Sequence, residues 1–112
     1  MKEIKVYFRT QLINELVKTL EEAGAPGMTV VEVHPVGYGF DPNYFEYSTD
    51  IRRLYPEITK LEIVCADEDV DKFVDVIQGV THTGAKGDGM IFISDIGEAV
   101  RIRSGERGER AL

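Results

Sequence analysis

The sequence predicts an α+β domain of the ferredoxin-like type (βαββαβ), with one antiparallel sheet and two helices on a single face. Three observations support this fold class. The chain has 112 residues, which suits one compact domain and leaves no room for two. Strand, helix and strand periodicities follow one another twice along the chain. A stretch with neither period separates the two units, an order typical of the split βαβ fold.

The first unit covers roughly residues 4–33. Ile4, Val6 and Phe8 alternate with polar or aromatic residues, which predicts a half-buried strand. Thr10 is expected to cap the following helix, and Gly24 is expected to end it. β-Branched residues between positions 28 and 33 predict a second strand. The apolar stripe of the helix consists of Leu12, Ile13, Leu16, Val17 and Leu20.

The second unit begins with a predicted strand over residues 60–66. Asp67 is expected to cap the next helix, which ends near Gly79 or His82. A fourth strand is predicted over residues 90–93, and residues 98–103 are expected to add a helical turn and an edge strand. The stripe of this helix consists of Val70, Phe73, Val74 and Ile77.

The sheet face without helices is expected to be too apolar to face water over its whole area. We therefore expect other subunits to cover it. The residues predicted on this face are Lys5, Tyr7, Arg9, Lys60, Glu62, Val64, Met90 and Phe92.

Composition excludes some function classes. The formal net charge of -7 argues against a nucleic-acid partner, because phosphate backbones repel an acidic surface. No apolar run is long enough to span a bilayer and the first residues lack a secretory signal, so a cytoplasmic location is expected. Cys65 is the only cysteine, and a buried, inert thiol is expected.

The glycine-rich segment from Thr83 to Gly89 lies between a helix and a strand. Glycines let backbone N–H groups approach phosphate oxygens and adopt positive φ, although a plain connecting turn would also use them. Arg101 and Arg103 would share one face of an extended strand with Ile102 turned inward, and each could fork onto a phosphate. A solvated basic edge strand is the alternative for these arginines.

Catalytic and metal sites have less support. His34 and His82 are the only histidines, and no cluster has the spacing of metal ligands. No nucleophile and base pair stands out, so we predict no catalytic residue. Two alternatives remain open: a slow nucleotide hydrolase using Asp88 or Glu62, and a ferredoxin-like metal-binding trimer using carboxylates with one of the histidines.

These motifs resemble those of the PII signal-transduction proteins of nitrogen regulation. The matching stretches are residues 24–30, 60–64, 83–92 and 101–108, and the resemblance extends along the whole chain. It implies a single PII-like domain (residues 1–112) that assembles into a homotrimer and binds ATP, ADP or AMP in clefts between subunits. The implied segments are a T-loop at about 37–55, a B-loop at about 82–90 and a C-loop at about 101–112.

The resemblance also implies a set of nucleotide contacts. Gly87, Asp88 and Gly89 would hold phosphates from one subunit, and Arg101 and Arg103 would come from its neighbour. Tyr7, which stands where the family usually has an aliphatic residue, would be a further nucleotide contact, on the adenine. The remaining implied nucleotide-binding residues are Thr29, Gly37, Glu62, Val64, Lys86 and Met90.

The departures from the family pattern concern the effector loop. Gly39 replaces a family glutamine that helps hold Mg²⁺ and 2-oxoglutarate, and Ile58 replaces a family lysine that pairs with the 2-oxoglutarate carboxylate. The loss of both contacts argues against 2-oxoglutarate sensing and leaves Mg²⁺ open. Met90 replaces a phosphate-binding lysine, and Ile51 replaces the tyrosine that some members uridylylate. We expect a non-enzymatic regulator that controls a target protein, such as a membrane transporter or an enzyme. The predicted partner-docking residues of the T-loop are Tyr38, Phe40, Tyr44, Phe45 and Tyr47.

Overall fold

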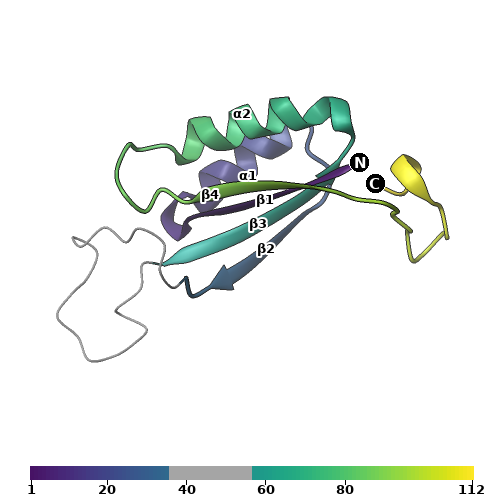
Figure 1. Cartoon of the computed structure of the whole chain (residues 1–112), viewed down its shortest axis with the longest axis horizontal. Helices are drawn as coiled ribbons and strands as arrows, with labels where there is room; N and C mark the ends of the chain where they lie inside the picture. The colour runs from purple at the N-terminus through teal and green to yellow at the C-terminus, as the bar shows by residue number, and fades with distance from the viewer. Residues whose placement is uncertain (36–56) are drawn as a thin grey trace.

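The computed structural model describes residues 1–35 and 57–112 (Figure 1). Its 3₁₀ turns are Thr10–Leu12, Asp67–Asp69 and Gly108–Ala111. In chain order the helices and strands are β1 (Lys2–Arg9), α1 (Ile13–Glu22), β2 (Met28–Val33), β3 (Ile58–Cys65), α2 (Val70–Thr81) and β4 (Met90–Asp95).

The four strands form one sheet in the order β2-β3-β1-β4. Each neighbouring pair is antiparallel. Both helices lie on the same face of this sheet (Figure 1). The predicted fold class is therefore confirmed.

The core lies between the helices and the sheet. Ile4, Val6 and Phe8 of β1 are almost fully buried, and each such side chain stabilises the fold by about 1.5–3 kcal/mol. Cys65 is also buried, and desolvation raises the pKa of its thiol, as expected for an unreactive cysteine. The other fully buried core side chains are Leu16, Leu20, Leu61, Ile63, Phe73 and Ile77.

The register of the sheet confirms most of the predicted open face. Lys5 pairs with Glu62 and Phe92, so the three side chains share one face. The rings of Tyr7 and Phe92 meet edge to face at 6.0 Å. Arg9 is the exception, because it is only 4% exposed and bonds to the loop after α2.

Both predicted helix caps are wrong. The Thr10 hydroxyl lies 2.8 Å from the Thr59 hydroxyl, and α1 begins at Ile13 without a side-chain cap. The Asp67 carboxylate binds the Met1 ammonium at 2.9 Å, and α2 begins at Val70. In each case a distant partner holds the side chain that would have capped the helix.

The predicted edge strand at residues 101–103 is also wrong. The Gly105 N–H donates to the Arg101 carbonyl at 2.8 Å, and the Arg101 N–H donates to the Glu106 carbonyl at 2.9 Å. The chain reverses here because Gly105 adopts a φ of 73°, which other residues rarely adopt. Ile102, predicted to turn inward, is fully exposed in the single chain.

Candidate functional site

The loop between α2 and β4 is organised around the Asp88 carboxylate. Oδ2 accepts hydrogen bonds from the N–H groups of Thr83 at 2.7 Å and Gly84 at 2.9 Å. Oδ1 accepts from the Thr83 hydroxyl and from the Arg9 guanidinium. Burial alone would raise the pKa of Asp88, but the bonds from Thr83, Gly84 and Arg9 outweigh it and hold the pKa well below 3.8.

Arg9 is the residue that sequence reasoning missed. Besides its ion pair with Asp88, Nη1 donates to the Thr83 hydroxyl at 3.0 Å and Nη2 donates to the Lys86 carbonyl at 2.9 Å. These partners lie 74 to 79 positions away along the chain. No local pattern could have linked them, and the alternation of β1 placed Arg9 on the open face.

The glycines give this loop its path. Gly84, Gly87 and Gly89 all have positive φ, at 86°, 92° and 113°, as the sequence predicted. A Cβ at Gly89 would lie 1.7 Å from the Tyr7 carbonyl oxygen, so the backbone passes directly against β1. Glycine is therefore required here both by conformation and by space.

The loop presents groups that suit an anion. Among the described residues, the amides of Lys86 and Gly87 donate to no acceptor, and the Lys86 side chain is exposed. Arg9 offsets the negative charge of Asp88 within the loop. Consecutive amides without acceptors, next to a glycine and an exposed lysine side chain, are a combination that binds phosphate oxygens.

A second group of predicted residues lies together elsewhere. Thr29, Glu62, Val64 and Arg101 line a hollow of about 270 Å³. Its remaining walls are Glu3, Pro26, Gly27, Ala111 and Leu112. The strand register explains why these residues lie together, because Thr29 of β2 pairs directly with Glu62 of β3. Within this wall the Glu62 carboxylate binds Lys60 at 3.0 Å.

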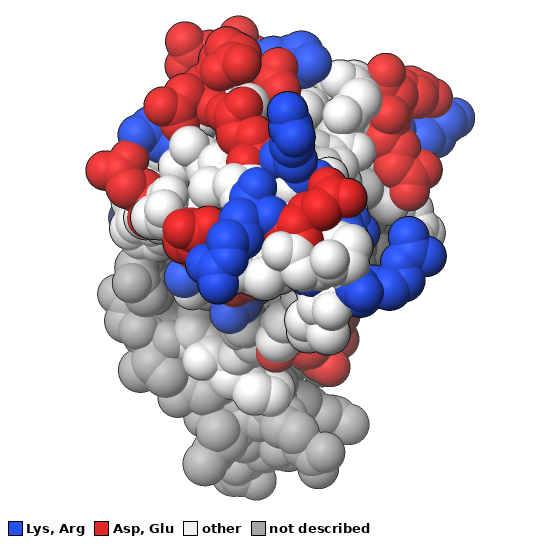
Figure 2. Space-filling view, turned by 90° about the vertical axis from the view of Figure 1, so that its right-hand side faces the viewer, with Lys and Arg blue, Asp and Glu red and all other residues white. Residues whose placement is uncertain are grey.

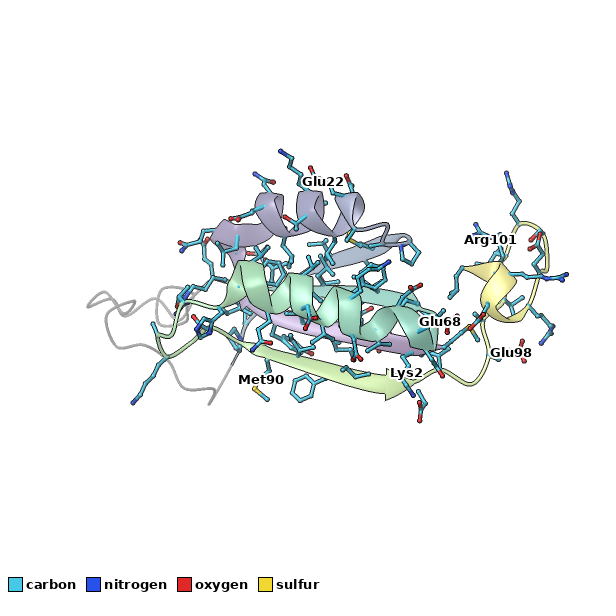
Figure 3. The ribbon with its side chains drawn as sticks, turned by 90° about the horizontal axis from the view of Figure 1, so that it is seen from above. Lys2, Glu22, Glu68, Met90, Glu98 and Arg101 are labelled. Atoms are coloured by element: carbon cyan, nitrogen blue, oxygen red, sulfur yellow. The ribbon has the colours of Figure 1, made fainter. Side chains whose placement is uncertain are left out.

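The loop and the hollow lie at opposite ends of the sheet. Tyr7, at the loop end of β1, pairs with Met90, whereas Lys2 pairs with Asp95 toward the C-terminal segment. Met90 and Arg101 are accordingly far apart in Figure 3. The eight residues of β1 span roughly 25 Å, so Arg101 and the loop cannot hold one phosphate within a single chain.

The surface at the hollow end carries charges of both signs. Seen from that side, basic and acidic side chains are interspersed (Figure 2). Arg103, predicted to bind phosphate, is exposed in the turn after Arg101. Gly37 and the docking residues Tyr38, Phe40, Tyr44, Phe45 and Tyr47 lie outside the described residues.

The described parts of the chain contain neither a metal-ligand cluster nor a membrane-spanning helix. Residues 1–35 and 57–112 contain no group of three or more His, Cys, Asp or Glu side chains placed to hold a metal ion. No helix in the same ranges combines the length and apolar character needed to cross a membrane.

Comparison with known proteins supports the resemblance noted in the sequence. The model of a family described as Nitrogen regulatory protein P-II matches residues 1–106. Nitrogen regulatory protein P-II 2 of Methanothermobacter thermautotrophicus is 46% identical, and the match covers 100% of this chain and 97% of that protein. Nitrogen regulatory protein P-II of Rhodobacter capsulatus is 36% identical, with both chains fully covered. The corresponding protein of Bradyrhizobium diazoefficiens is also 36% identical over both full lengths.

Proposed function

Because the chain belongs to the nitrogen regulatory protein P-II family, we propose that it is a non-enzymatic sensor of adenine nucleotides. ATP, ADP or AMP binds between the subunits of a homotrimer and changes the T-loop, which then controls a target protein. The observation that carries this proposal is the division of the predicted contacts into two groups at opposite ends of one sheet. Each group is incomplete without the other.

The loop group is suited to the phosphates. In the described chain the amides of Lys86 and Gly87 donate to no acceptor, the Lys86 side chain is exposed, and Asp88 is paired with Arg9. The hollow, with Thr29, Glu62 and Val64 on its walls, is suited to the adenosine part. Arg101 lies on the same wall and would extend from the hollow toward phosphates held by the neighbouring subunit's loop.

The open sheet face supports assembly into a trimer. Val31, Met90 and Phe92 are each 40–48% exposed in the single chain. Apolar side chains on one face of a sheet favour burial against another subunit. A cyclic arrangement would bring the loop of one chain to the hollow of the next.

The structure favours a sensor over a hydrolase. Asp88 accepts four hydrogen bonds and has a lowered pKa, so it is a poor general base. Glu62 is held by Lys60. In a phosphate-release assay with ATP we expect only background turnover, and turnover well above background would contradict the regulatory assignment.

Titration calorimetry tests the proposal directly. We expect ADP or ATP to bind the unmodified protein at micromolar concentrations, and Arg101→Gln to weaken binding at least tenfold, since a charge-assisted contact contributes about 1.5–3 kcal/mol. Lys18→Gln, on the exposed face of α1, is the matched control and should bind normally. The absence of ATP, ADP and AMP binding below millimolar concentrations would overturn the proposal.

The target stays a prediction, as does the cytoplasmic location. The family name supports a regulatory role, and we propose a transporter or an enzyme as the target. Pull-down with the nucleotide-loaded protein, compared with the nucleotide-free protein, would show whether a partner binds in only one of the two states. Equal capture in both states would contradict control by nucleotide, because a ligand shifts a loop only through its differential affinity.

A further inference from the structure

We propose that Arg9 is a positioning residue of the loop between α2 and β4 (residues 83–88), here called the phosphate loop. This inference rests on the proposed nucleotide function. Arg9 holds residues 83–88 in their phosphate-receiving shape before any ligand arrives. It acts through the loop rather than by contact with the nucleotide.

The first argument is the geometry of the guanidinium. One planar group joins the Thr83 hydroxyl, the Lys86 carbonyl and the Asp88 carboxylate, which lie at the start, middle and end of the loop. Removing this group would leave the three acceptors without their common donor. A lysine could not replace it, because an ammonium is a compact point charge without the rigid fork of arginine.

The second argument is burial. Arg9 is 4% exposed and its nitrogens are already engaged with the loop. To reach a phosphate it would have to leave Asp88, which would place an uncompensated carboxylate beside the ligand. Like charges at such short range repel strongly. Phosphate binding is therefore favoured when the ion pair between Arg9 and Asp88 stays intact.

The third argument is the position of Arg9 in the fold. It is the last residue of β1, opposite Ile58, and the Thr10 N–H donates to the Glu57 carbonyl at 3.0 Å. β1 also supports the loop at Gly89, which passes against the Tyr7 carbonyl. The end of β1 thus holds the loop at two points, through the Arg9 side chain and through the Tyr7 backbone beside Gly89.

The experiment compares four proteins: the unmodified chain, Arg9→Lys, Arg9→Met and the control Lys18→Met on the exposed face of α1. Binding of ADP and of adenosine is measured by calorimetry. We expect both Arg9 variants to bind ADP at least tenfold more weakly and adenosine within about twofold of the unmodified chain, because they lose the bonds that shape the phosphate loop. The control should bind both ligands normally.

Nuclear magnetic resonance of the ligand-free proteins supplies a readout that does not depend on binding. The amide protons of Thr83 and Gly84 donate to Asp88. Their chemical shifts should move toward the values of an unstructured chain in both Arg9 variants, whereas the amide chemical shifts of β3 should not change. Arg9→Lys keeps a similar bulk and charge, so it serves if Arg9→Met fails to fold.

The outcomes separate the two proposals. If the unmodified chain binds no nucleotide, the proposed function fails and this role fails with it. If the unmodified chain binds ADP and Arg9→Lys binds it equally well, only the inference about Arg9 is overturned, because a point charge would then suffice. Equal weakening of ADP and adenosine would also overturn it, since the damage would then extend beyond the loop.

Discussion

Asp88 links the chemistry of the phosphate loop to the stability of the fold. Its pKa is lower in the folded chain than its ordinary value of 3.8, so its stabilising contribution is complete above that value and is lost as pH falls toward the lower folded pKa. We expect Asp88→Asn to reduce the free energy of unfolding by about 1–3 kcal/mol at pH 7, and by less at pH 3. Urea unfolding of both proteins at the two pH values measures this. A cost that is independent of pH would contradict the role of the carboxylate charge.

Gly89 and Gly79 allow the same substitution to be compared in opposite settings. Gly89→Ala would place a Cβ 1.7 Å from the Tyr7 carbonyl at a φ of 113°, so we expect destabilisation of more than about 2 kcal/mol. Gly79 lies in α2 with nothing within 4 Å of its Cβ position, so Gly79→Ala should stabilise the fold by about 0.5–1 kcal/mol. Thermal unfolding of both variants gives the two signs. A tolerated Gly89→Ala would show that the loop does not pass against β1.

Single residues also show where sequence reasoning stops. Ile4 and Phe73 were predicted to be buried because periodicity is a local property, and both are. Thr10 and Arg9 were misplaced because their partners, Thr59 and Asp88, are distant in the sequence. The glycines of the loop were predicted from composition, but the donor that holds the loop together could be found only from the fold.

Among the elements, the strands and helices follow their hydrophobic periods, whereas the C-terminal segment does not form the predicted strand. Its path depends on Gly105 and on backbone bonds between Arg101 and Glu106, and such a turn leaves no periodic signal. The ends of α1 and α2 were predicted correctly by Gly24 and His82. Their starts were not, since 3₁₀ turns precede both helices.

The C-terminal segment is predicted to serve binding more than folding. Every fully buried core side chain lies between Ile4 and Ile77 in the described chain. A chain ending at Gly97 should therefore unfold within about 1 kcal/mol of the full chain yet bind ADP at least tenfold more weakly, because Arg101 and the last walls of the hollow are gone. Denaturant titration and calorimetry measure the two effects. A truncated chain that retains full ADP affinity would remove the hollow from the site.

At the scale of the whole molecule, the sheet is covered on one face only. The helices bury one side, whereas Met90 and Phe92 on the other remain 48% and 43% exposed. The loop and the hollow lie at the two ends of this open face. A neighbouring subunit that covers the face can therefore bring its own loop and hollow next to those of the first chain. Covering the face and completing the site are therefore expected to be one event.

Mixing two inactive variants tests this connection. Lys86→Glu damages the loop and Arg101→Gln damages the hollow, so each homogeneous trimer should bind ADP weakly. In trimers assembled from equal amounts of both, a site is intact when its loop comes from an Arg101→Gln chain and its hollow from a Lys86→Glu neighbour. In a closed ring each condition holds for half of the chains, so calorimetry should recover about one quarter of the unmodified number of sites. Recovery of no sites would mean that the loop and the hollow of different chains do not combine, and the single chain would then have to bind nucleotide by itself, which the roughly 25 Å length of β1 argues against.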